Sequence, residues 1–133
     1  MKASIAWPIL ATMVLGGAAF AADLKDEVKV EIASAGAHSD MTPGTYVCAA
    51  GHFHVKGTVQ NLAAEPIGPV KVAGKVFDAE GKVIGTATAT TRRPVLNPND
   101  KADVDLEFLT VTGPLLKQVK NQELSVVAVG PKP

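Results

Sequence analysis

The chain has 133 residues, with 13 basic and 13 acidic side chains and a formal net charge of zero. The charges are scattered along the chain, which argues against nucleic acid as a partner, because nucleic acid is usually bound by a clustered basic surface. The length suits a single domain of about 100 residues behind a leader segment, with one modest hydrophobic core.

Residues 1–21 have the pattern of a cleavable secretory signal peptide. A basic start at Lys2 precedes an apolar stretch, and a run of small residues ends in Ala19-Phe20-Ala21, which is an A-x-A cleavage site. The apolar stretch is shorter than the roughly 20 residues that span a bilayer. We therefore expect cleavage after Ala21, a periplasmic or secreted protein, and no membrane span in the mature chain, residues 22–133.

The mature chain shows no sustained helical stripe, whereas several segments alternate apolar and polar residues as β-strands do. The first strand is expected at residues 28–32. After an irregular segment with a predicted turn at Pro43-Gly44, a second strand begins at His52. Its residues Phe53 and Val55 are expected to point inward and His54 outward, because successive side chains of a strand alternate between faces.

Four more strands are expected further along, with a hairpin loop at 78–82 and one short helical turn near 115–119. The predicted strand ranges are 70–76, 82–90, 102–108 and 123–129. Two long Pro-containing connections, at 61–69 and 92–100, suit crossings between two sheets better than a simple meander. Six to seven short strands with regular turn signals predict an all-β, immunoglobulin-like antiparallel sandwich.

Two motifs resemble the FxLYD family of bacterial exported domains. The first is the V-x-G-x-V-x-N pattern from Val55 to Asn61, and the second is the strand and D-x-x-G-K-V hairpin from Val76 to Thr86. The resemblance covers roughly Phe53 to Val129. It departs from the family pattern where the leading Phe is replaced by Gly74. The resemblance implies a small immunoglobulin-type sandwich with no catalytic residues.

The soft and borderline metal ligands of the mature chain all lie in one short segment. They are His38, Met41, Cys48, His52 and His54. Imidazole, thiolate and thioether groups are the ligands that copper and zinc select, and copper is favoured over zinc by their softness. The sequence therefore predicts a candidate copper site between residues 38 and 54.

Strand geometry supports part of this candidate site. His52 and His54 lie two residues apart, so they project from the same face at about 7 Å spacing. Cys48 would lie about 13 Å from His52 in a straight strand, so the thiol approaches only if Ala49-Ala50-Gly51 turns the chain back, which Gly permits.

Other interpretations of these residues stay open. The histidines can be solvated, and Cys48 can be a small buried hydrophobe, a ligand shared in a dimer, or half of an intermolecular disulfide. Cys48 with a histidine can also form a thiol nucleophile, although no recognisable local signature surrounds it. The alternating carboxylates Asp103, Asp105 and Glu107 can bind calcium, but such a row is more often a solvated strand surface.

Together these features predict an exported, non-catalytic binding or interaction domain that is a monomer or a weak homodimer. The alternative is a periplasmic copper-binding protein, for copper delivery or electron transfer. The sequence does not distinguish the two, because a fold of this kind does not determine a function.

Overall fold

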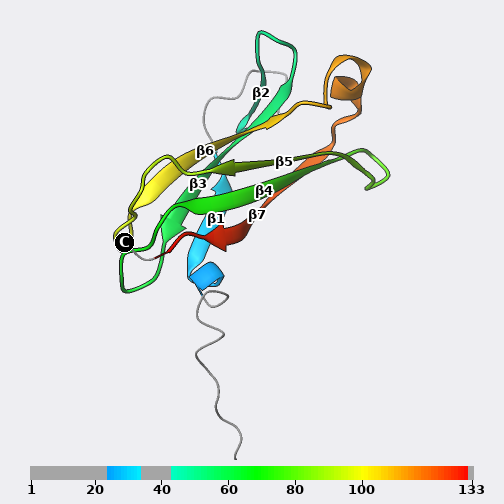
Figure 1. Cartoon of the computed structure of the whole chain (residues 1–133). Coiled ribbons are helices and arrows are strands. Elements are labelled where there is room, and N and C mark those ends of the chain that lie inside the picture. The colour runs from blue at the N-terminus through cyan, green and yellow to red at the C-terminus, as the bar shows by residue number, and fades with distance from the viewer. Residues whose placement is uncertain (1–23, 34–42, 132–133) are drawn as a thin grey trace, which may run out of the picture.

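The computed structural model describes residues 24–33 and 43–131, which form two antiparallel β-sheets packed face to face (Figure 1). The strands are β1 (Val28–Ile32), β2 (Thr45–Val47), β3 (Phe53–Asn61), β4 (Val70–Phe77), β5 (Val83–Thr90), β6 (Lys101–Phe108) and β7 (Asn121–Val129). The sheets do not close into a barrel, so the predicted all-β antiparallel sandwich of six to seven strands is confirmed.

Strand β3 is the centre of the first sheet. On one side it pairs with β1 along its C-terminal half and with β2 along its N-terminal half. On the other side it pairs with β6 over nearly its whole length. Cross-strand neighbours directly opposite each other lie about 5 Å apart, so side chains on the outer face of β3 meet those of β2 and β6.

The second sheet has the order β5-β4-β7. Both long connections predicted from the sequence cross between the two sheets, since β3 and β6 lie in the first sheet and β4 and β5 in the second. The two connections also touch each other, because the backbones of Ile67 and Leu96 exchange a pair of hydrogen bonds of 2.9 Å each. The 3-10 helix η2 (Gly113–Gln118) carries the chain from β6 to β7.

The core lies between the sheets and is built from the inward residues of the alternating strands. In β3 and β6 every second residue is buried, as the sequence pattern predicts. The largest fully buried side chains are Phe108, Ile67, Leu96, Leu106, Val55, Val59, Val70, Val72, Val76, Val111, Asn61 and Thr45. Each large aliphatic side chain contributes about 1.5–3 kcal/mol by leaving water, and this burial determines which face of β3 points outward.

One difference from the sequence-based expectation bears on the site. Strand β2, only three residues long, falls at the end of the segment expected to be irregular. Gly44, the predicted third residue of a turn, has a φ of 80° and leads directly into β2. Among residues 24–33 and 43–131, no helix is long and apolar enough to cross a membrane.

Candidate metal centre

A tight hairpin between β2 and β3 brings Cys48 back toward the start of β3. The backbone N–H of Cys48 donates to the carbonyl of His52 at 3.0 Å, and that of Gly51 donates to the carbonyl of Cys48 at 2.9 Å. Gly51 has a φ of 87°, a left-handed conformation that glycine adopts at little steric cost. The Cys48 Sγ consequently lies 4.0 Å from His52 Nδ1.

Strand β6 supplies two carboxylates that face the two histidines. Glu107 is the register partner of His54 across the β3–β6 pair, and Asp105 lies two residues further along the same face. His54 Nδ1 lies 2.8 Å from Asp105 Oδ1, and His52 Nδ1 lies 2.8 Å from Glu107 Oε2. In these two hydrogen bonds Nδ1 is the donor, because an ionised carboxylate only accepts hydrogen bonds.

Two contacts hold the His54 ring in one orientation, and a hydrogen bond between its two partners supports them. Its Nδ1 donates to Asp105, and its face stacks on the Tyr46 ring with centroids 4.4 Å apart and planes 20° from parallel. The Tyr46 hydroxyl donates to the second oxygen of Asp105. With the proton on Nδ1, the neutral ring presents the lone pair of Nε2.

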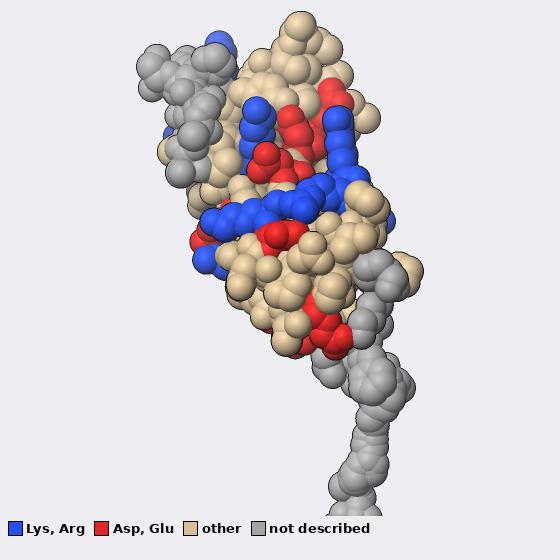
Figure 2. All heavy atoms as spheres, turned by 90° about the vertical axis from the view of Figure 1, so that its left-hand side faces the viewer, with Lys and Arg blue, Asp and Glu red and all other residues tan. Residues whose placement is uncertain are grey.

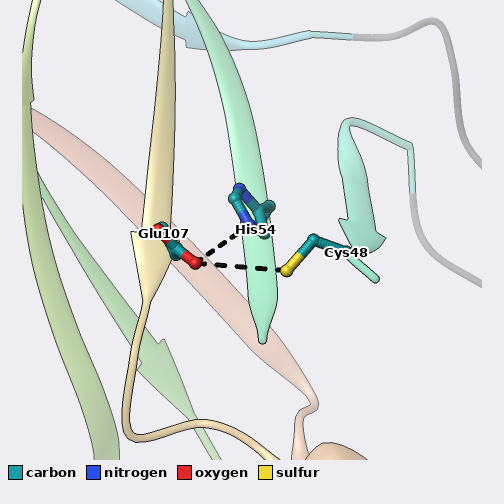
Figure 3. A group of neighbouring side chains, drawn as sticks. All are labelled: Cys48, His54 and Glu107. Carbon is teal, nitrogen blue, oxygen red and sulfur yellow. Dashed lines mark hydrogen bonds and ion pairs between the residues drawn. The ribbon is translucent and has the colours of Figure 1, made fainter. Parts of the chain in front are cut away.

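That Nε2 atom is buried and has no hydrogen-bond partner among the described residues. The His54 side chain is only 11 % exposed, and its Nε2 lies 3.7 Å from Glu107 Oε2. Cys48 Sγ lies 4.0 Å from the same carboxylate oxygen. The three donor atoms lie within 4.8 Å of one another and point toward a common space (Figure 3). A buried polar atom without a partner costs about 1–3 kcal/mol, and this cost would be removed by an ion bound between the three donors.

The surroundings favour the thiolate form of Cys48. The pKa of the Cys48 thiol is lowered to about 7, mainly by a hydrogen bond from the His52 backbone. Partial burial raises this pKa, whereas His54 and a hydrogen bond from the Ala50 backbone lower it further. Burial lowers the pKa of His54, but its contacts with Asp105 and Cys48 outweigh burial and raise it overall. Burial and the hydrogen bond to Asp105 raise the pKa of Tyr46 to about 12, so its hydroxyl stays a donor.

The structure brings together three of the five residues that the sequence predicted as metal ligands. Cys48, His52 and His54 converge, whereas His38 and Met41 lie outside the described residues. Sequence reasoning missed Glu107, Asp105 and Tyr46 as members of the cluster. It assigned the two carboxylates to a solvated strand surface, where both are indeed exposed, but it did not foresee that each also contacts a histidine.

Charges of both signs share the molecular surface around these strands. Figure 2 shows a face that is crossed by a band of basic side chains, with acidic side chains above and below the band. A shallow groove of about 680 Å³ runs beside the cluster, and its lining includes Lys56, Arg92 and Asp105 but neither Cys48 nor His54. The cluster is therefore a surface site next to the groove and does not form its floor.

No protein-family profile matches this chain, and no curated protein matches it either. Among solved structures, the chain is similar to IrmA from Escherichia coli, with a TM-score of 0.49 and 14% sequence identity over 80% of this chain and 86% of that one. Similarity at this level says nothing about what this chain binds.

Proposed function

We propose that this chain is an exported, non-catalytic binding domain whose ligand is a transition-metal ion. The observation that carries the proposal is the buried Nε2 of His54, which has no hydrogen-bond partner among the described residues and faces the Cys48 thiol and the Glu107 carboxylate. The opposite ring nitrogen donates to Asp105. Histidines that ligate metals almost always donate their other ring N–H to a carboxylate, a backbone carbonyl or water.

The low pKa of Cys48 supports the same function, because the thiolate and not the thiol ligates a metal. The ion belongs to the borderline class that includes zinc and copper, because both metals are bound by thiolate and imidazole ligands, of which this site has one and two. Export to an oxidising compartment, an immunoglobulin-like fold and the FxLYD resemblance are parts of the proposal that rest on the sequence.

A thiol nucleophile is the second candidate function, because Cys48, His54 and Asp105 have the order of a nucleophile, a base and an orienting carboxylate. Glu107 argues against it. Its carboxylate lies 4.0 Å from the thiol and 3.7 Å from His54 Nε2. It therefore occupies the space in which a thiol nucleophile would contact its base and its substrate. A metal ion, by contrast, gains from that negative charge.

Metal titration of the purified, untagged protein tests the proposal. We expect zinc(II) or copper(I) to bind at one ion per chain, and the Cys48→Ala, His52→Ala, His54→Ala triple variant to lose this binding. An Asp103→Asn variant serves as the matched control, because Asp103 lies on the same outward face of β6 but pairs with Thr58. Equal binding by the wild type and the triple variant would refute a metal site here.

The two candidate functions respond differently to Glu107→Gln. In a metal site the variant loses a ligand and binds the ion more weakly. In a thiol nucleophile the variant loses a competing negative charge, so iodoacetamide would alkylate Cys48 as fast as in the wild type or faster. Added metal would then affect the variant and the wild type in the same way.

A further inference from the structure

We propose that the ion is zinc(II), or a divalent ion of the same class, held by Cys48, His54 and Glu107, with His52 as the fourth ligand. This inference rests on the proposed metal-binding function and narrows it to one class of ion and one set of donors. It replaces the copper preference that the sequence alone suggested.

The donor set is the first argument. The sequence favoured copper because of the softness of the whole set of imidazole, thiolate and thioether donors. Among the described residues, the donor that joins Cys48 and His54 is a carboxylate, that of Glu107. Zinc(II) accepts Cys sulfur, His nitrogen and Glu oxygen in the same site, whereas carboxylate oxygen is a hard donor that does not suit copper(I).

The spacing of the donors is the second argument. Metal–ligand bonds of about 2.0–2.3 Å at tetrahedral angles place neighbouring donor atoms roughly 3.3–3.7 Å apart. The Nε2 of His54 lies 3.7 Å from Glu107 Oε2, and the Cys48 Sγ lies 4.0 Å from the same oxygen. Movement of a few tenths of an ångström brings the Glu107 oxygen to zinc-binding distances, and its flexible side chain, 42 % exposed, can supply it. The donor atoms of Cys48 and His54 lie within 4.8 Å of each other and would also have to approach.

His52 contacts two of the three donors, although it lies outside the group whose donor atoms are all within 4.8 Å of one another. Its Nδ1 lies 4.0 Å from Cys48 Sγ and 2.8 Å from Glu107 Oε2. The second distance is that of a hydrogen bond, so His52 holds the carboxylate while the site is free of metal. When the ion binds, the His52 ring proton moves from Nδ1 to Nε2, and the lone pair of Nδ1 faces the ion in place of the N–H.

Four protein ligands also agree with a binding function. Zinc sites with three protein ligands keep a fourth position open for water or substrate, whereas sites with four are closed to chemistry. With His52 as a ligand, Cys48 and Glu107 surround the ion on the exposed side and His54 holds it from within. The inference therefore predicts a site that stores or exchanges its ion without activating a bound water.

Titration with cobalt(II), a spectroscopic substitute for zinc(II), tests the ion class. We expect wild-type protein to develop a near-ultraviolet thiolate-to-cobalt band and the intense visible bands of a tetrahedral site, and zinc(II) to abolish both at one equivalent. Cys48→Ser should remove the near-ultraviolet band. Affinity for copper(II) is not informative, because copper(II) binds more tightly than zinc(II) to nearly any site with nitrogen, oxygen or sulfur ligands.

The dependence on Glu107 decides between zinc(II) and copper(I). Loss of even an outer partner of a metal ligand usually costs 10–100-fold in affinity, so we expect Glu107→Gln to weaken zinc(II) binding by about 100-fold. The Asp103→Asn control should bind as the wild type does. Copper(I) binding that needs Cys48 but is unaffected by Glu107→Gln, with no tight zinc(II) binding, would overturn the ion class and leave the metal-binding function standing. Binding of neither ion would refute both.

The role of His52 has its own test. We expect His52→Ala to weaken zinc(II) binding by at least about 10-fold and to change the visible cobalt(II) bands, because water replaces an imidazole. Unchanged affinity and spectrum would overturn the assignment of His52 as a ligand. Thermal unfolding of each metal-free variant shows whether a loss of binding reflects loss of the fold.

Discussion

Asp105 tests most directly whether the site is built to hold His54 for a metal. Its carboxylate accepts a hydrogen bond from His54 Nδ1 at 2.8 Å and another from the Tyr46 hydroxyl, yet its oxygens are not among the three converging donor atoms. It is therefore a positioning residue. Asp105→Asn keeps the shape of the side chain and removes its charge, so the variant changes the hydrogen bonding with little change in packing.

The expected loss follows from what an amide can do at this position. If the Asn oxygen keeps the Tyr46 hydroxyl, its N–H₂ group faces His54 Nδ1 and donates to it, which moves the ring proton to Nε2, the proposed metal ligand. If the amide turns the other way, His54 Nδ1 keeps an acceptor but a neutral one. Either outcome makes Nε2 a poorer ligand, and losses at such outer partners are typically 10–100-fold, or about 1.4–2.7 kcal/mol.

Two measurements on Asp105→Asn separate positioning from a general structural effect. Zinc(II) affinity, measured by competition with a chromophoric chelator, should fall by that factor, while the Asp103→Asn control stays at the wild-type value. In metal-free protein at a pH above the raised pKa of His54, where the ring is neutral, ¹⁵N chemical shifts of the imidazole should show the proton on Nδ1 in the wild type and a shift toward Nε2 in the variant. Affinity equal to that of the control, together with an unchanged tautomer, would refute the reasoning.

Four further outcomes are expected. Asn61→Ala should lower the free energy of unfolding by about 2–3 kcal/mol in urea denaturation, because it removes three hydrogen bonds of 2.8–2.9 Å from a fully buried side chain; a loss below about 0.5 kcal/mol would contradict this. Gly51→Ala should cost about 1–2 kcal/mol from its φ of 87° and weaken metal binding, since the loop positions Cys48; unchanged affinity would show that the loop tolerates the change. N-terminal sequencing of the exported protein should begin at Ala22, and a start at Met1 would rule out a cleaved signal. Zinc(II) at about 100 times its dissociation constant should stabilise the wild type by about 2.7 kcal/mol and Glu107→Gln by less, and equal stabilisation would exclude Glu107 as a ligand.

Most of the fold could be predicted from the sequence because alternation is a local signal. The alternation from Phe53 onward and from Ala102 to Phe108 set both the strands and their buried faces. The turn that folds Cys48 back could also be anticipated, since a glycine precedes His52 and permits a positive φ. Strand β2 was missed because three residues, Thr45–Val47, are too few to show a period.

The carboxylates of the site could not be predicted in the same way. Alternation places Asp105 and Glu107 on the outer face of their strand, but it does not say which strand lies next to it. The pairing of β3 with β6 joins residues more than 50 positions apart, such as His54 and Asp105. Only that pairing turns two separate polar faces, one with histidines and one with carboxylates, into a single cluster.

The division between local and distant donors also bears on how the site works. Cys48, His52 and His54 lie within seven residues, so an unfolded chain can already bind a metal weakly through them, and such binding stabilises the fold little. Glu107 is 59 residues from Cys48 and reaches them only in the folded sheet. The ion therefore distinguishes the folded from the unfolded chain mainly through Glu107 and through the orientation that Asp105 imposes on His54. A metal site recognised from the Cys and His residues alone would lack the two carboxylates that make binding depend on the fold.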